Sequence, residues 1–316
     1  MSAALLALAL LVAPDSGWIA GPDGVRLYYQ KIGNGTPTII VPGRLFLAHE
    51  LAPLAERHTL ILYDMRNRGR SSRVEDGRLL SIQKDVEDLE AVRRHFGVER
   101  FVPIGYSYLG LMVVLYSMKH PERVERLIQL GPVPRKFDTE YPASLLHRDS
   151  APVVSPAAAA RLDSLEQAGW LTEHPKEFCE ESRVTAVRLV GDPAKAASLP
   201  DLCDMPHEWP VNLRRHFDHH FAGVQRLDVP REAVARVKMP VLILTIHGTW
   251  DRNAPYAAGR EWALTLPDAR LITVERAAHQ LVTDAPEIVL PAIDEFVSGR
   301  WPSRAEKITT LERSPL

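Results

Sequence analysis

The chain has 316 residues, 46% of them hydrophobic, which is enough to bury a large core as one extended domain or as a core with an insertion. A formal net charge of −2 and a pI near 6.6 give no electrostatic basis for binding nucleic acid or an anionic membrane, and no nucleic-acid-binding motif stands out. The substrate is therefore expected to be a small molecule or a short peptide.

Residues 1–16 open with an apolar run, AALLALALLVA at positions 3–13. The run is too short for a bilayer-spanning helix, which needs about 20 residues, so we expect no stable membrane insertion. It is long enough for the hydrophobic region of a signal peptide, but no lysine or arginine precedes it and the cleavage site is poor. A signal peptide and an N-terminal helix both remain open, and so do a secreted or periplasmic location and a cytoplasmic one.

Strand and helix patterns then alternate along the chain. The elements expected in its first part are a hairpin at 18–32, strands at 38–42 and 59–64, and helices near 47–57 and 81–96. The last of these helices has the clearest pattern, because apolar residues recur at helical spacing between Ser81, which can cap its start, and Gly97, which can end it. Alternation of this kind predicts a mainly parallel sheet covered by helices on both faces.

The most informative segment is GYSYLG at 105–110, which lies between a short apolar strand pattern and an apolar helix pattern. A serine on a sharp strand-to-helix turn exposes its hydroxyl at the top of a sheet, and the N–H groups at the start of the helix can hold an oxyanion. Ser107 is thus a candidate nucleophile, although Leu109 replaces the second glycine of the G-x-S-x-G pattern. The alternative is a tight turn with an ordinary exposed serine. A further strand is expected at 124–130.

Between 136 and 238 the pattern changes to helical pieces separated by prolines, such as 155–168 and 173–190. Both cysteines of the chain, Cys179 and Cys203, lie in this stretch. An exported protein could join them in a disulfide, whereas in a cytosolic protein they would be two unrelated thiols. Their spacing is not that of a metal site.

Two later loops supply an acid and a base. A strand pattern at 239–246 is followed by Asp251, and a second one at 270–274 is followed by His279. Taken singly, Asp251 could cap a helix and His279 could be a surface histidine. Together with Ser107 they form a nucleophile, an acid and a base, each at the C-terminal end of a predicted strand. Their chain order is the one that α/β-hydrolases use.

On these residues the chain resembles the α/β-hydrolase superfamily over nearly its whole length. Besides the serine turn, the segments that carry the resemblance are PTIIVPGR at 37–44, LILYDMRNRGRSS at 60–72, GTWDRNAP at 248–255 and the pair Ala278-His279. Pro42 stands where the family has histidine and Asn67 where it has glycine, and asparagine tolerates a left-handed backbone better than most residues. Serine at 107 argues against dehalogenase and epoxide hydrolase relatives, whose nucleophile is aspartate.

The resemblance implies an α/β fold, with a mainly parallel sheet of the eight-stranded type and helices on both faces. The implied parts are a core at 17–135 and 239–300, an inserted helical lid at 136–238 and a polar, loosely packed tail at 301–316. Within the lid, His219 and His220 suggest a metal only superficially. Adjacent residues of a helix point roughly 100° apart, so solvated or packing roles are expected for them.

The resemblance also implies a mechanism that needs neither a metal nor an organic cofactor. His279 would take the proton of Ser107 as the hydroxyl attacks a carbonyl carbon, and Asp251 would orient and stabilise the imidazole. The backbone N–H groups of Arg44 and Tyr108 would hold the oxyanion of the tetrahedral intermediate.

Three functions remain open. The first is hydrolysis of small carboxylic esters or amides, with specificity set by the lid. The second is removal of an N-terminal residue from short peptides, because the lid also resembles that of the proline iminopeptidase group. Enzymes of that group bind the free amine of their substrate with lid carboxylates. Asp204, Glu208 and Asp218 are candidates for that role, although ordinary surface charge explains each of them equally well. The third function is that of a ligand receptor on the same fold with little or no turnover. The sequence does not indicate an oligomeric state.

Overall fold

The computed structural model describes residues 15–146, 154–200, 211–235 and 242–312. An eight-stranded sheet runs through the molecule in the order β1-β2-β4-β3-β5-β6-β7-β8. Its strands are β1 (Asp15–Ala20), β2 (Arg26–Ile32), β3 (Thr38–Pro42), β4 (Thr59–Tyr63), β5 (Val102–Tyr106), β6 (Arg126–Leu130), β7 (Leu242–Gly248) and β8 (Ala269–Val274). The strands β1, β2 and β4 pair antiparallel, and all neighbours from β4 to β8 pair parallel. The predicted mainly parallel sheet is thus confirmed.

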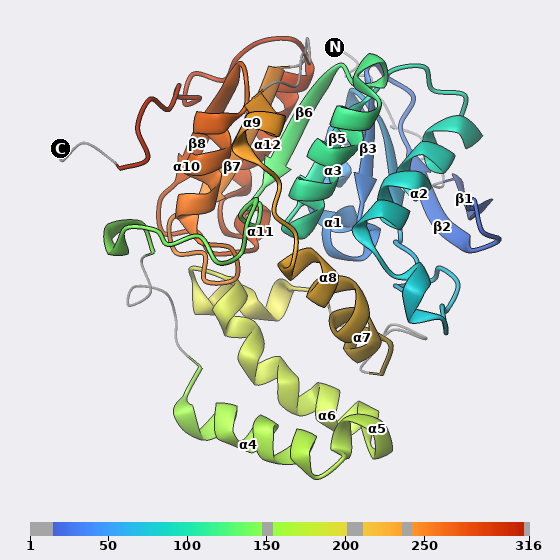
Figure 1. The fold of residues 1–316 in the computed structure, drawn as a ribbon, viewed down its shortest axis with the longest axis vertical. Helices are drawn as coiled ribbons and strands as arrows, with labels where there is room; N and C mark the ends of the chain where they lie inside the picture. Colours follow the sequence, from blue (N-terminus) through green and yellow to red (C-terminus); the bar gives the residue numbers. More distant parts are fainter. Residues whose placement is uncertain (1–14, 147–153, 201–210, 236–241, 313–316) are drawn as a thin grey trace, which may run out of the picture.

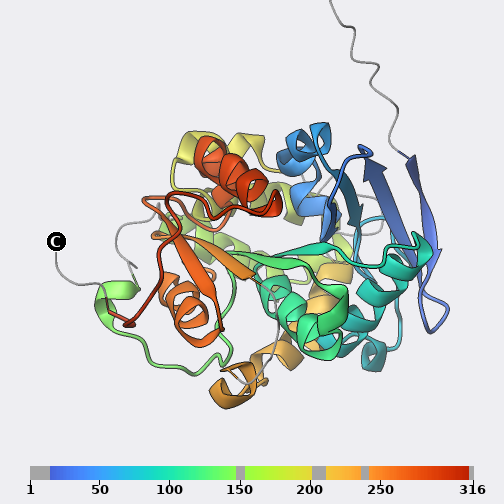
Figure 2. The ribbon, with the colours of Figure 1, turned by 90° about the horizontal axis from the view of Figure 1, so that it is seen from above.

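Helices cover both faces of this sheet (Figure 2). One face packs against α2 (Ile82–His95), α3 (Tyr108–Lys119) and α10 (Tyr256–Thr265), and the other against α1 (Arg44–Leu51) and α12 (Pro286–Val297). Neighbouring residues of a strand point to opposite faces, so Ile40 of β3 belongs to the first of these cores and Ile39 to the second. The C-terminal ends of the parallel strands are therefore held between two packed layers.

Two expected helices are shorter than predicted. The helix expected near 47–57 is α1 followed by a 3₁₀ turn at Ala52–Glu56, because the proline in this turn has no N–H to continue the α-helical hydrogen bonds. The piece expected at 173–190 divides into α6 (Pro175–Ser182) and a 3₁₀ segment (Arg183–Leu189).

The segment between β6 and β7 is helical, and its helices α4 to α8 lie below the sheet in the view of Figure 1, whereas α9 lies beside the sheet. Its helices are α4 (Pro156–Gln167), α5 (Trp170–Glu173), α6, α7 (Val211–Arg215), α8 (Ala222–Gln225) and α9 (Arg231–Ala235). Ser155 caps α4, since its hydroxyl accepts the N–H of Ala158 at 3.1 Å. Cys179 in α6 is buried and disulfide-bonded, while Cys203, the other cysteine of the chain, lies outside the described residues.

The two ends of this insertion are joined at its root. Lys136 and Asp228 form an antiparallel bridge. Next to it, the N–H of Val229 donates to the carbonyl of Arg135 at 3.2 Å, and the Arg135 guanidinium donates to the carbonyl of Val229 at 2.8 Å. The chain therefore leaves the core and returns to it at one point.

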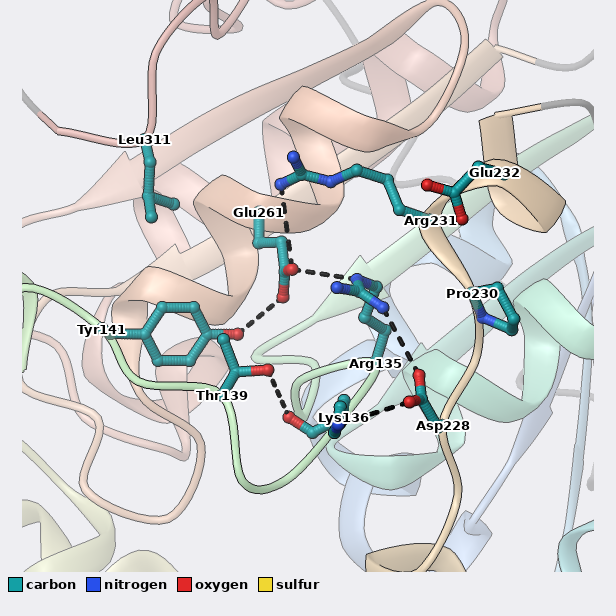
Figure 3. Close-up of a pocket in the computed structure, with 10 residues that line it drawn as sticks. All are labelled: Arg135, Lys136, Thr139, Tyr141, Asp228, Pro230, Arg231, Glu232, Glu261 and Leu311. Atoms are coloured by element: carbon teal, nitrogen blue, oxygen red, sulfur yellow. Dashed lines mark hydrogen bonds and ion pairs between the residues drawn. The ribbon is translucent and has the colours of Figure 1, made fainter.

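Glu261 of α10 fastens this root to the core (Figure 3). Its buried carboxylate accepts hydrogen bonds from Arg135 at 2.9 Å and from the Tyr141 hydroxyl at 2.6 Å, and Arg231 lies 3.9 Å away. These side chains line a hollow of about 520 Å³. Because Arg135, Lys136, Asp228, Arg231 and Glu261 around the hollow pair with one another, we interpret it as a structural junction.

The C-terminal tail packs on the sheet, which corrects the expectation of loose packing. Glu306 and Leu271 of β8 exchange two backbone hydrogen bonds of 2.8 Å. Arg260 of α10 donates to the carbonyls of Thr310 and Glu312 at 3.0 Å each. The tail thereby covers part of the edge strand β8, whose backbone groups would otherwise be open to pairing with another chain.

The apolar run at the amino terminus lies outside the described residues, and β1 begins at Asp15. In the ranges that the structure describes, no helix is long and apolar enough to cross a membrane.

Candidate active site

Ser107 lies on a strained turn between β5 and α3. Its backbone has φ 58° and ψ −129°, a conformation that costs a residue with a β-carbon on the order of 1–3 kcal/mol. The residues on either side, Tyr106 and Tyr108, are buried, whereas Ser107 is partly exposed. The turn therefore presents the serine hydroxyl at the C-terminal edge of the sheet, as the sequence predicted.

The tight packing of this turn explains why Leu109 can replace a glycine. A β-carbon at Gly105 would lie 2.2 Å from the carbonyl oxygen of Leu109, and one at Gly110 would lie 2.9 Å from the β-carbon of Pro132. These two positions require glycine, whereas Leu109 lies inside α3 and is buried in the core. Both glycines that the turn needs are thus present, the first where G-x-S-x-G has it and the second one position later.

Asp251 and His279 form a buried pair at the ends of the next strands. Asp251 follows β7, and its Oδ1 accepts the N–H groups of Asn253 and Ala254 at 2.9 Å each. Its Oδ2 lies 2.8 Å from Nδ1 of His279, which follows β8. Both side chains are almost fully buried. The structure therefore brings together the acid and the base that the sequence predicted.

The surroundings of Asp251 favour its charged form. Burial alone would raise the pKa of this carboxyl group. The charge of His279 and hydrogen bonds from His247 and His279 outweigh the effect of burial and hold the pKa of Asp251 well below its usual range. The group is therefore a carboxylate at neutral pH and can hold the Nδ1 proton of His279.

Two contacts bring the segments next to Ser107 close to this pair. The ring of Tyr106 packs on the ring of His279, with centroids 4.8 Å apart. A β-carbon at Gly131, directly after β6, would lie 3.1 Å from Oδ2 of Asp251, and the Ser107 N–H donates to the last carbonyl of β6 at 2.9 Å. The Ser107 hydroxyl makes no hydrogen bond within the described residues, and such bonds often tighten only when substrate binds. The contact between Ser107 and His279 stays a prediction.

The two expected oxyanion donors lie at helix starts. Tyr108 is the first residue of α3, and Arg44 is the first residue of α1, after Gly43 with φ 81°. The first N–H groups of a helix have no partner within the helix and point outward. The Arg44 side chain has a different role, because its guanidinium donates two hydrogen bonds of 3.1 and 3.0 Å to buried Asp64. Only the backbone of Arg44 is therefore a candidate for oxyanion binding.

In the part of the chain that the structure describes, none of the three expected lid carboxylates lies at this site. Asp204 and Glu208 lie outside the described ranges. Asp218 is exposed and accepts a hydrogen bond from Arg214 at 3.1 Å, so its negative charge is paired at the surface. The interpretation of Asp218 as an anchor for a substrate amine is therefore not supported, because a buried ammonium needs a buried partner.

The sequence did not predict that two histidines of the lid are buried and pack against each other. The rings of His216 and His220 stack 4.5 Å apart, and Nε2 of His220 lies 2.6 Å from Oδ2 of Asp85. Burial, with the charge of a nearby arginine, holds the pKa of His216 well below its usual range. The ring of Tyr108 packs 5.0 Å from that of His220, so the lid covers the residue after the nucleophile. No signal could have indicated this pairing, because Asp85 and His220 are 135 residues apart.

In the described part of the chain, no group of three or more histidine, cysteine, aspartate or glutamate side chains is placed to hold a metal ion.

A cleft of about 750 Å³ opens beside the acid loop. It is lined by Pro134, Phe137, Thr139, Glu140, Tyr141, Leu146, Asp251, Arg252, Asn253 and Pro255. Cavities of about 300–1,000 Å³ accommodate small-molecule ligands. The start of the insertion contributes all the aromatic side chains of this lining together with polar Thr139 and Glu140, and the acid loop contributes mainly polar side chains.

This combination of sheet order, strained serine turn and acid–base pair defines a class of protein. Residues 42–153 match the family model described as the alpha/beta hydrolase fold. The chain has the α/β-hydrolase fold, and the proteins to which it is similar include hydrolases.

The similar proteins include several kinds of hydrolase. The chain is 23% identical to a bifunctional esterase/perhydrolase of Acinetobacter calcoaceticus, over 89% of this chain and 99% of the relative. It is 24% identical to a probable proline iminopeptidase of Streptomyces coelicolor, over 90% of this chain and 96% of the relative. Among solved structures it resembles the meta-cleavage product hydrolase of Pseudomonas fluorescens IP01, with a TM-score of 0.68 and 18% identity over 89% of this chain and 97% of the other.

Proposed function

We propose that the protein is a serine hydrolase, which cleaves an ester or amide bond of a small substrate through Ser107, His279 and Asp251. One observation carries the proposal. Ser107 sits on a strained turn at the strand ends where His279 and Asp251 form their 2.8 Å hydrogen bond. A serine that a strained backbone turn presents at the same strand ends as a general base is an arrangement suited to nucleophilic catalysis.

The proposed reaction has two halves. His279 takes the proton of Ser107 as the hydroxyl oxygen attacks the carbonyl carbon of the substrate. The backbone N–H groups of Arg44 and Tyr108 stabilise the oxyanion, and one such donor typically lowers the barrier by about 3–4 kcal/mol. When the intermediate collapses, His279 gives the proton to the leaving group and Ser107 keeps the acyl group. Water, deprotonated by His279, then releases the acid and restores Ser107.

The cleft beside Asp251 supports a small substrate. Its volume of about 750 Å³ is within the range of small-molecule sites. Phe137 and Leu146, from the start of the insertion, would contact an apolar part of the substrate, and Asp251 itself lines the cleft. Residues of the insertion would therefore take part in setting specificity.

An aminopeptidase of the proline iminopeptidase type is the second candidate. The observation that favours it is the similarity to the Streptomyces relative over 90% of this chain, which includes the insertion. The described part of the lid offers no buried carboxylate for the substrate amine, since Asp218 is exposed and paired with Arg214. An ester or amide without a free amine is therefore the substrate that the described residues favour.

The test compares kcat/KM on two chromogenic substrates, prolyl p-nitroanilide with a free amine and a short-chain p-nitrophenyl ester without one. Ester cleavage that Ser107→Ala abolishes is the expected result. Arylamide cleavage lost on blocking the amine would instead establish the aminopeptidase.

Labelling with a fluorophosphonate identifies the nucleophile directly. We expect the wild-type serine to be labelled and Ser107→Ala to remain unlabelled while keeping its far-UV circular dichroism spectrum. Ligand binding with an unlabelled wild-type protein and no turnover would mean a receptor on the same fold, and would refute the serine hydrolase.

A further inference from the structure

A second histidine approaches the catalytic carboxylate. His247, the residue before the end of β7, is completely buried. Its Nε2 lies 2.9 Å from the carbonyl oxygen of Ala254 and 3.3 Å from Oδ2 of Asp251. The imidazole thus connects the strand end to both the acid and the loop that carries it.

The contacts determine where the proton of this ring lies. A carbonyl oxygen and a carboxylate oxygen are both acceptors, so Nε2 of His247 must carry a hydrogen and donate it toward Ala254 and Asp251. On the other side of the ring, Nδ1 is buried and has no hydrogen-bond partner within the described residues. In the described arrangement His247 therefore acts as an N–H donor through Nε2.

The fold makes room for this ring in one orientation. A β-carbon at Gly259 of α10 would lie 2.4 Å from Nδ1 of His247. The ring of Tyr256 stands at 84° to the imidazole, with centroids 6.0 Å apart. Any larger residue at 259 would displace the imidazole, so the ring is fixed by the helix that packs on it.

Both histidines meet Asp251 at the same oxygen. Oδ2 receives Nδ1 of His279 at 2.8 Å and Nε2 of His247 at 3.3 Å. Oδ1 is already saturated by the two backbone N–H groups of the acid loop at 2.9 Å. The carboxylate is thus held at both oxygens, and its negative charge is shared between two imidazole donors.

We propose that His247 is a positioning residue of the triad, whose Nε2–H holds Oδ2 of Asp251 toward His279 and takes up part of its negative charge. The inference rests on the proposed function, because it assigns His247 a task within the Ser107–His279–Asp251 triad. It goes beyond a role in loop stability, which the hydrogen bond to the carbonyl of Ala254 would provide alone.

The charge-sharing role has its own consequence. Without the His247 donor, Asp251 keeps more negative charge and stabilises the protonated form of His279 more strongly. A higher pH is then needed to deprotonate His279, so the acid limb of the pH–activity profile moves to higher pH. The other titratable groups that face the Asp251–His279 pair are Tyr106, whose ring packs on His279, and Asp284, which accepts the N–H of Ala278 at 2.7 Å. Neither is altered by a substitution at 247.

The experiment compares three substitutions at this position. In His247→Gln the side-chain amide can place an N–H near the position of Nε2, in His247→Leu the volume is kept without a donor, and in His247→Asn the shorter amide cannot reach Oδ2. The asparagine variant replaces the leucine variant if the latter does not fold.

The matched control is His58→Leu. His58 is also buried and also bonds a carboxylate and a carbonyl, with Nε2 2.9 Å from Asp294 and Nδ1 3.2 Å from the carbonyl of Thr36. It lies outside the candidate site, so its loss should lower Tm without changing the reaction.

The first measurement is the acylation rate with a p-nitrophenyl ester as a function of pH. We expect His247→Leu to acylate about tenfold more slowly, as removal of one hydrogen bond to a charged group implies, with its acid limb at higher pH. His247→Gln should stay within about threefold of the wild type, and His58→Leu should keep the wild-type profile.

The second measurement does not depend on turnover. The His279 Nδ1 proton, bonded to Asp251, should give a far-downfield resonance in the proton NMR spectrum of the wild type and of His247→Gln, which moves or disappears in His247→Leu. An unchanged resonance and an unchanged acid limb in a folded leucine or asparagine variant would overturn the positioning role. A wild type that no fluorophosphonate labels, with this resonance still sensitive to His247, would refute the proposed function and leave the positioning role standing.

Discussion

Replacing Gly131 with alanine should damage catalysis far more than folding. Gly131 has φ 50°, a backbone conformation that costs an alanine about 1–2 kcal/mol in the folded state. Alanine also reduces the conformational freedom of the unfolded chain, which offsets part of this loss of stability. The added β-carbon would lie 3.1 Å from Oδ2 of Asp251 and 3.6 Å from Nδ1 of His279. To relieve these contacts the carboxylate must move by a few tenths of an ångström. A 1 Å misplacement can cost about 100-fold in rate, so we expect kcat/KM to fall about tenfold.

Gly97→Ala is the matched control for this substitution. Gly97 has φ 62°, but a β-carbon there would meet nothing within 4 Å. Both variants should lose about 1 kcal/mol of unfolding free energy, or about 2 °C in Tm, which urea unfolding and a thermal scan would measure. Only Gly131→Ala should lose activity on the p-nitrophenyl ester. Equal activity in the two variants would refute the argument that the space beside Gly131 serves the acid–base pair.

Three further predictions concern other parts of the molecule. Ser107→Gly should be as inactive as Ser107→Ala. Its unfolding free energy should exceed that of Ser107→Ala by about 1 kcal/mol, because glycine adopts φ 58° without strain. Equal unfolding free energies of the two variants in urea would contradict this. Hydrogen bonding from Arg93 lowers the pKa of Glu90 to about 2, so Glu90→Gln should lose about 1–2 kcal/mol at neutral pH after solvent screening. The difference should vanish as pH falls from about 4.5 toward 2, and a pH-independent difference in urea unfolding would contradict the assignment. Glu261→Ala should raise amide hydrogen exchange at both ends of the insertion, around Arg135 and at 227–235, and unchanged exchange would show that the backbone bridge alone holds the root.

The strand ends, and the approach of Asp251 to His279 at those ends, could be predicted because their signals are local. Ser107, Asp251 and His279 each follow an apolar run that forms a strand, and the C-terminal ends of parallel strands meet at one edge of the sheet. The pair formed by Asp251 and His279 follows from that topology without knowledge of any other side chain. The serine turn was predictable as well, because its glycines at 105 and 110 are required by close backbone packing.

Contacts between distant segments left no comparable signal. The pairing of His220 with Asp85 joins a lid helix to α2, and nothing in either local pattern indicates the other. His247 was overlooked for a different reason, because it belongs to an apolar strand pattern and only the turn after β7 brings it back to Asp251. The tail was expected to be loose from its polar composition, but backbone hydrogen bonds of Glu306 with β8 do not depend on side-chain polarity.

The bridge between Lys136 and Asp228 joins the two ends of the insertion at its root. These two ends lie side by side, so the two segments that connect the insertion to β6 and β7 are held together at the root. The length and composition of the intervening stretch can change without altering the register of β6 against β7, provided that the residues at the root are kept. The architecture therefore allows two parts of the chain to change separately: the strand ends hold Ser107, Asp251 and His279, while the residues between the two ends of the insertion can vary.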